Sequence, residues 1–189
     1  NGREVNFKSP RDAIAARIGM VTEDRRRTGL MLAAMVRHNI VLPSLTEHHK
    51  PMNFLDFPWE ENVSREYVKK LDVKTPGIET EISHLSGGNQ QKVVLGKWLE
   101  TEPRVLILNG PTVGVDIAAK FDIHAYLRTL AEKMNLAILL ISDDISEVLN
   151  NCNRILIIKN GRIVSEHVNT ELDPHKLQEL VTGGKEETA

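Results

Sequence analysis

Two kinds of apolar spacing alternate along the second half of the chain. Short, near-continuous apolar runs are typical of buried strands, and segments with apolar positions every three to four residues are typical of helices. The expected strands are residues 105–108, 136–141 and 154–158, and the expected helices are 86–100, 118–134 and 145–150. This alternation predicts an α/β fold around a mostly parallel sheet, with core strands covered on both faces.

The chain after residue 158 predicts a hairpin and a last helix. The pair Asn160-Gly161 separates the strand ending at residue 158 from an apolar segment at 163–165, and glycine supplies the positive φ that such a turn needs. A closing helix is expected over about 174–180. Residues 183–189 carry no apolar anchor, and we expect a disordered tail there.

The first half opens with a short capped helix and a strand. Ser9 followed by Pro10 is typical of a helix start, and residues 18–21 form an apolar run. A charged loop is expected at 23–29. From about residue 30 to 74 the pattern consists of helical pieces, which predicts a small helical subdomain interrupted at Pro43, Pro51 and Pro58.

Composition indicates one folded domain without a broad basic face. Of the 189 residues, 41% are hydrophobic and 26% charged, and the formal net charge is -2. We therefore expect a soluble chain that binds no nucleic acid. The single cysteine, Cys152, excludes an internal disulfide and is interpreted as small core filler.

The motif richest in chemistry is Leu85-Ser86-Gly87-Gly88, directly before a predicted helix. Two glycines let a phosphate approach backbone N–H groups, the helix start adds partial positive charge, and Ser86 offers a hydroxyl. The plainer interpretation is a serine N-cap followed by a glycine turn. The motif alone leaves both open.

Other polar clusters also allow two interpretations. His38, His48 and His49 match no strong zinc spacing and are interpreted as solvated loop histidines, so no metal site is expected. The run Arg25-Arg26-Arg27 suits either a partner contact or a solvated loop.

The helix-start motif continues as Asn89-Gln90-Gln91-Lys92, and a strand then leads to Pro111-Thr112-Val113-Gly114-Val115-Asp116. This pattern resembles the second ATP-binding cassette of the tandem ATPase subunits of bacterial monosaccharide importers of the ribose, xylose and galactoside type. The resemblance covers about residues 1–169 and is weakest over 46–62. It implies a partial RecA-like P-loop NTPase core with a helical subdomain and a C-terminal β-hairpin. The implied boundaries are an incomplete nucleotide-binding domain at 1–182, with the helical subdomain at about 30–74 and the core at about 83–169.

The resemblance also assigns roles to individual residues. Two such cassettes face each other, and each ATP lies between the Walker motifs of one and the signature motif of the other. Ser86, Gly87, Gly88 and Asn89 would contact the γ-phosphate of a nucleotide held by the partner cassette. Glu23 takes the Gln-loop position. Asp116 takes the position of the loop between cassettes, although helix capping explains an Asp there equally well.

Three features of the sequence depart from a working ATPase site. No Gly-x-x-x-x-Gly-Lys-Ser/Thr loop occurs, and the resemblance would place it before Asn1 of a longer protein. Where the family has Asp and then Glu, this chain has Asn109 and Gly110, which offer neither a carboxylate for Mg²⁺ nor a group to orient water. At the position of the γ-phosphate histidine stands Asp143, which would repel phosphate, while Asp143 or Asp144 would also serve as a helix cap.

These departures predict a degenerate site that is inactive alone. ATP and Mg²⁺ would act in the full-length assembly, with neither held tightly by this chain. The implied partners are a second cassette, transmembrane permease subunits and, indirectly, a sugar-binding protein, at the cytoplasmic face of the cell membrane. A scaffolding cassette that does not respond to ATP is the alternative. A soluble DNA-repair or translation ATPase is disfavoured because heptad arms and basic extensions are not seen.

Overall fold

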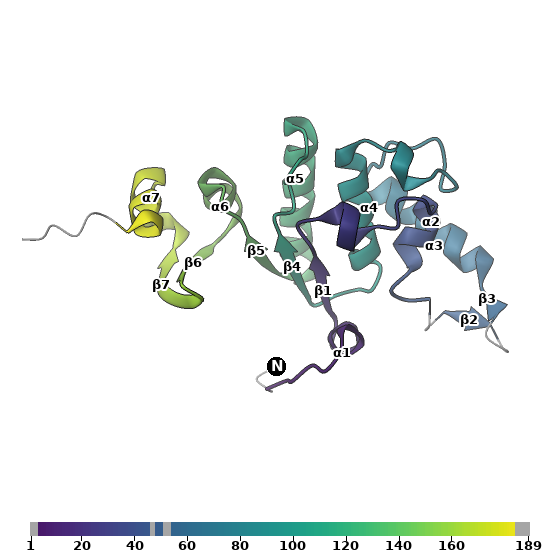
Figure 1. Ribbon diagram of the computed structural model, residues 1–189, viewed down its shortest axis with the longest axis horizontal. Coiled ribbons are helices and arrows are strands. Elements are labelled where there is room, and N and C mark those ends of the chain that lie inside the picture. The colour runs from purple at the N-terminus through teal and green to yellow at the C-terminus, as the bar shows by residue number, and fades with distance from the viewer. Residues whose placement is uncertain (1–3, 46–47, 51–53, 184–189) are drawn as a thin grey trace, which may run out of the picture. The chain divides into compact units, whose positions relative to one another are not determined.

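The computed structural model describes residues 4–45, 48–50 and 54–183, and it divides into two compact units (Figure 1). The first comprises residues 1–139 and the second residues 140–189. No helix within the described ranges is both long enough and apolar enough to cross a membrane.

A three-stranded sheet forms the centre of the first unit. Its strands are β1 (Ile18–Val21), β4 (Val105–Asn109) and β5 (Ala137–Ile141), in the order β1-β4-β5. β1 and β4 run parallel, with Ile18 opposite Val105. Parallel strands joined through helices confirm the predicted α/β fold.

The strands are packed more completely on one face than on the other. Val21, Leu106 and Leu108 are fully buried, on the face where Gly19 lies against Trp98 of the helix α4 (Gly87–Leu99). On alternate positions Met20 is 41% exposed. In β5, Leu139 and Ile141 are each 47% exposed. The expectation that both faces are covered is therefore wrong for β5, in which no residue is buried, whereas every residue of β4 is at least partly buried.

The helix α4 is the main packing element of the first unit. Residues 90–97 and Leu99 are all buried, so the helix does not have the exposed outer face that an amphipathic pattern predicts. It contacts β1, the helix α2 (Val36–Val41) and the helix α5 (Ile117–Met134). A helix buried all round is placed rigidly, which fixes the position of its first residues.

Residues 30–74 contain, besides helical pieces, a small strand pair that the sequence did not reveal. α2 and α3 (Phe57–Lys70) pack together, and β2 (His49–Lys50) pairs antiparallel with β3 (Phe54–Leu55). Pro58 lies in the first turn of α3, where proline needs no N–H partner, so it begins a helix rather than interrupting one. Pro51 lies outside the described residues.

Short helical elements complete the first unit. The helix α1 (Pro10–Ala15) begins at the predicted cap, where Ser9 and Asp12 form a capping box. Residues expected to form a charged loop instead include η1 (Arg25–Gly29), a single π-helical turn. The 3-10 turn η3 (Ile82–His84) leads into α4.

The second unit is a hairpin with two helices packed against it. Its elements are α6 (Ile145–Asn151), β6 (Arg154–Lys159), β7 (Arg162–Val168), η4 (Asn169–Glu171) and α7 (Pro174–Thr182). Asn160 and Gly161 have φ of 51° and 74°, which confirms the predicted turn. Ile155, Ile157 and Leu177 form its core. The predicted tail from residue 184 onward lies outside the described residues.

Candidate functional site

Ser86 begins α4 as its N-cap. Its exposed Oγ accepts hydrogen bonds from the backbone N of Asn89 at 3.4 Å and from Asn89 Nδ2 at 2.9 Å. The Oδ1 of Asn89 in turn accepts from the backbone N of Lys74 at 2.7 Å. The capping interpretation is confirmed, and the side chain of Asn89 is held between the helix cap and the segment after α3.

The two glycines that follow are required by close packing. A Cβ on Gly88 would lie 2.8 Å from the Cβ of Ala119 in α5. A Cβ on Gly87 would lie 2.7 Å from Nη2 of Arg25 and 3.1 Å from the backbone O of Gly114. The start of α4 therefore meets α5 and the loop before it so closely that a larger residue at either glycine would require its neighbours to shift.

Arg25 bridges η1 and that loop. Its Nη1 donates to the backbone O of Val113 at 2.8 Å, and its Nη2 donates to the backbone O of Gly114 at 3.2 Å. Partial burial, reinforced by the charge of Arg26, lowers the pKa of Arg25. The solvated-loop interpretation is thus wrong for Arg25, although Arg26 and Arg27 are exposed. The sequence held no signal that distinguishes the first arginine from the next two.

The π-helical turn η1 is anchored at both ends. Asp24 caps it by accepting from the backbone N of Arg27 at 3.1 Å. At the other end the buried Nζ of Lys97, from α4, donates to the backbone O of Gly29 at 3.0 Å. Burial lowers the pKa of Lys97. The segment that follows Glu23 is therefore attached to the same helix that carries Ser86 and the two glycines.

The end of β4 brings Asn109, Gly110 and Glu23 together. Gly110 has φ of +55°, and a Cβ there would lie 3.0 Å from Cγ2 of Val113 and 3.1 Å from Cγ of Glu23. The aliphatic part of Glu23 thus occupies space that a side chain at position 110 would need. Gly110, which directly follows Asn109, therefore lies close to Glu23 in space.

Asp116 and Asp144 are both helix caps. Asp116 Oδ1 accepts from the backbone N of Ala119 at 2.9 Å at the start of α5. In the second unit, Asp144 Oδ1 accepts from the backbone N of Glu147 at 3.0 Å at the start of α6. The capping role predicted for Asp143 or Asp144 therefore belongs to Asp144.

The remaining polar candidates have structural contacts. His38 lies in α2 with its Nε2 3.7 Å from the buried Glu60, so the loop interpretation is wrong for it. His48 is exposed in a bend before β2, as predicted, and its ring stacks on Trp59 with centroids 4.2 Å apart. The side chain of His49 is outside the described part. Across the described residues, no group of three His, Cys, Asp or Glu side chains could hold a metal ion.

One further anchor escaped the sequence pattern. The fully buried Gln90 donates from Nε2 to the backbone O of Ile82 and of Leu85, each at 3.1 Å. These two hydrogen bonds hold residues 82–85, which lead into α4, against the helix. A glutamine inside a signature-like run gives no hint of this role in the sequence.

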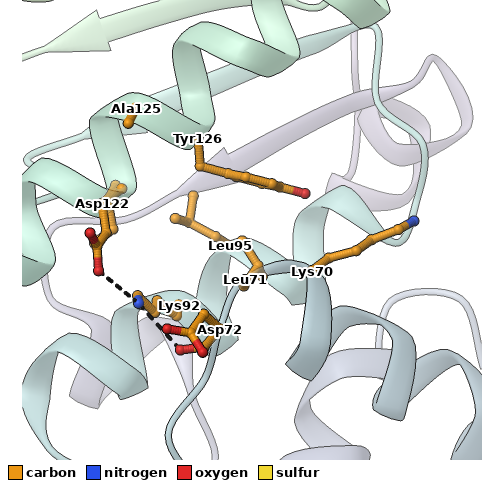
Figure 2. A pocket seen from close by; sticks show the side chains of 9 residues that line it. Lys70, Leu71, Asp72, Lys92, Leu95, Asp122, Ala125 and Tyr126 are labelled. Atoms are coloured by element: carbon orange, nitrogen blue, oxygen red, sulfur yellow. Dashed lines mark hydrogen bonds and ion pairs between the residues drawn. The ribbon is translucent and has the colours of Figure 1, made fainter.

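A cavity of about 250 Å³ lies where the end of α3 meets α4 and α5 (Figure 2). Lys92 crosses its floor and bonds both the backbone O of Asp72 and the Oδ2 of Asp122, each at 3.3 Å. These charges are matched within the protein. The cavity is therefore explained by packing between helices.

Comparison of the fold with solved structures identifies its class. The dimeric, post-hydrolysis ATP-binding cassette MJ0796 bound to ADP and Pi superposes with a TM-score of 0.69 at 22% identity, covering 81% of this chain and 63% of that one. The ADP form of MJ1267, an ATP-binding cassette of an ABC transporter, gives 0.72 at 19% identity, covering 97% and 71%. The chain has the fold of an ATP-binding cassette.

Sequence comparison finds relatives among sugar-import ATP-binding proteins. Over 98% of its length the chain is 40% identical to the xylose import ATP-binding protein XylG of Thermoanaerobacter pseudethanolicus, covering 36% of that protein. Over 97% it is 38% identical to the ribose import ATP-binding protein RbsA of Bacillus subtilis, covering 37%. No protein-family model matches it. The chain resembles a segment of sugar-import ATP-binding subunits and spans about a third of their length.

Proposed function

We propose that this chain is part of the ATP-binding subunit of a sugar importer and acts by completing the nucleotide site of a partner cassette. The observation that carries the proposal is the start of α4. Ser86 is exposed there, at the tip of a 13-residue helix whose body is buried. The first-turn N–H groups have no partner within the helix and carry partial positive charge, which suits a phosphate.

At the catalytic positions of this chain, Asn109 and Gly110 offer neither a good ligand for Mg²⁺ nor a group that activates water. Asn109 is a neutral amide, which is a poor ligand for a hard cation that needs carboxylate charge. Gly110 has no side chain, and Val113 and Glu23 close the space beside it. We therefore assign no catalytic step to this slot.

Chemistry in the partner's site would instead draw on the α4 tip. ATP held by the partner would supply the reacting phosphoryl group. Donors aimed at the phosphoryl oxygens stabilise charge that develops during transfer, and such donors typically contribute about 10²–10³ in rate. Asp116, at the cap of α5 beside Gly88, would lie at the same contact between cassettes. The permease and a sugar-binding protein would complete the importer at the cytoplasmic face of the membrane.

The test is a charge reversal at the α4 tip in the full-length subunit assembled with its permease. Gly87→Asp should abolish ATP hydrolysis and sugar uptake, because a carboxylate would face the γ-phosphate. Gly77→Asp is the matched control, since Gly77 does not adopt a positive φ and a Cβ there would meet only the flexible end of the Glu79 side chain, at 3.3 Å. Unchanged hydrolysis and uptake in Gly87→Asp would contradict the proposal.

A scaffolding role is the second candidate, and the neutral pair Asn109 and Gly110 favours it. Under this alternative the assembly would hold together without the cassette responding to nucleotide. Calorimetric titration of the full-length subunit with Mg-ATP separates the two. Loss of nucleotide affinity in Gly87→Asp supports a signature role, whereas identical titrations of the two proteins would support the scaffold.

A further inference from the structure

We propose that Arg25 is the positioning residue that holds the start of α4 and the 110–116 loop in register with each other. The inference rests on the proposed function, because it concerns how the phosphate-facing tip is kept in place. Arg25 lies next to Glu23 and Asp24, outside the α4 tip itself. Arg25 positions Ser86 and Gly87 indirectly, by holding the 110–116 loop against the start of α4.

The hydrogen bonds of Arg25 support this role directly. Its two terminal nitrogens reach the adjacent carbonyls of Val113 and Gly114, at 2.8 and 3.2 Å. A planar guanidinium matches two neighbouring acceptors, which a lysine ammonium does not reproduce. The loop is thereby fixed from η1, across 88 and 89 residues of sequence.

Packing at Gly87 links the same guanidinium to the α4 tip. The Nη2 atom lies 2.7 Å from where a Cβ on Gly87 would be, and the Gly114 carbonyl lies 3.1 Å from it. The guanidinium thus fills the space between Gly87 and the loop. Movement of Arg25 would leave both segments without a common support.

Two backbone hydrogen bonds within the loop between β4 and α5 are local. Within it, the backbone N of Val113 bonds the O of Gly110, and the backbone N of Val115 bonds the O of Thr112, both local turn contacts. Local turns fix the shape of a loop but not its position relative to a distant helix. The Arg25 contacts join Val113 and Gly114 to η1, which is distant in the sequence.

The first test measures amide hydrogen exchange in the 189-residue chain. Arg25→Ala should speed exchange at the amides of Val113 and Val115 by about tenfold or more, as expected for loss of charge-assisted hydrogen bonds. Arg26→Ala, an exposed neighbour, is the matched control. Equal exchange in the two variants would overturn the proposal.

A double-mutant cycle keeps the proposal testable if Arg25→Ala is poorly stable. Gly87→Ala should be damaging where Arg25 is present, because the new methyl group displaces the guanidinium. In the Arg25→Ala background the same change should cost clearly less, which would appear as non-additive shifts in the urea midpoint. Additive shifts would contradict contact between the two positions.

The functional arm uses the full-length subunit in its assembly. Arg25→Ala should lower kcat for ATP hydrolysis about tenfold or more with little change in KM, and Arg25→Lys should recover only part of the loss. If Gly87→Asp silences hydrolysis but Arg25→Ala matches wild type, the positioning role is wrong while the proposed function survives. If Gly87→Asp is itself harmless, the proposed function fails.

Discussion

At the scale of single residues, Gly110 does more than leave out a side chain, because its backbone conformation and its neighbours also disfavour one. Its φ of +55° places it in the left-handed region, and Glu23 and Val113 crowd the missing Cβ. A side chain restored at this position would therefore be strained in its backbone and in its contacts. The space beside position 110 is therefore closed, and neither Asn109 nor Gly110 carries a carboxylate.

Substitution of Gly110 by alanine measures that closure. Gly110→Ala should lower the free energy of unfolding by about 2–3 kcal/mol, from left-handed strain together with steric contact. Gly114→Ala, with φ of +66° but only ordinary 3.7 Å contacts, should cost about 1–2 kcal/mol. Urea denaturation compares the two, and equal losses would show that the space beside Gly110 is open.

Cys152 offers a pH-dependent readout from the second unit. Burial, reinforced by the charge of Glu147, raises the pKa of its thiol. The folded state therefore favours the protonated thiol. This preference stabilises the folded protein fully below the unfolded thiol pKa of about 8.5, and the stabilisation is lost as pH rises through the higher pKa of the folded state. Alkylation near that pH should be slower than for a free thiol, and denaturant should accelerate it. Since this is the single cysteine, mass spectrometry gives the rate directly; a native rate equal to that of the free thiol would contradict the assignment.

At the scale of elements, the start of α4 combines a structural and a proposed functional role in one side chain. Ser86 caps the helix, and the same hydroxyl would face phosphate. Helix caps prefer Ser, Asp and Asn, whereas a phosphate contact excludes a carboxylate. The two roles can therefore be separated by substitution.

Substituting Ser86 by alanine or by aspartate separates the effect on stability from the effect on ATP hydrolysis. Ser86→Ala should cost about 1 kcal/mol of stability through loss of the cap. Ser86→Asp should retain stability in the chain but abolish ATP hydrolysis in the assembled subunit, because it places negative charge at the phosphate contact. Thermal melts and hydrolysis rates give the two readouts. Normal hydrolysis by Ser86→Asp would contradict a phosphate contact at this hydroxyl.

Elements with strong local signals were the ones that sequence could predict. Ser9-Pro10, Ser86 and Asn160-Gly161 mark a cap, a helix start and a turn through their own backbone chemistry, and each was found in the structure. The π-helical turn η1 and the short β2–β3 pair were missed. Their geometry depends on contacts with distant segments, which local propensity does not record.

The candidate site follows the same division. The motif identified Ser86 and the glycines, while Arg25 and Gln90 were not distinguished from their neighbours. Arg25 acts through carbonyls 88 and 89 residues away, and backbone acceptors leave no mark in a sequence. Residues that position a motif are therefore harder to predict than the motif.

At the scale of the whole molecule, the proposed function would have the chain supply one half of the chemistry that a cassette pair needs. Its α4 tip has the shape and polarity to face a phosphate, and its β4 end lacks the groups that bind Mg²⁺ and orient water. A protein built this way would contribute to one hydrolysing site in a pair. The other site would bind nucleotide weakly or turn it over slowly.

The phosphate released in a single turnover tests this asymmetry most directly. The full-length subunit in its assembly would be loaded with radiolabelled ATP at both sites, mixed with excess unlabelled ATP, and the labelled phosphate counted over time. The proposed asymmetry between the two sites predicts a fast phase of one phosphate per subunit, with any second phosphate released far more slowly or not at all. A fast phase of two phosphates per subunit would contradict it.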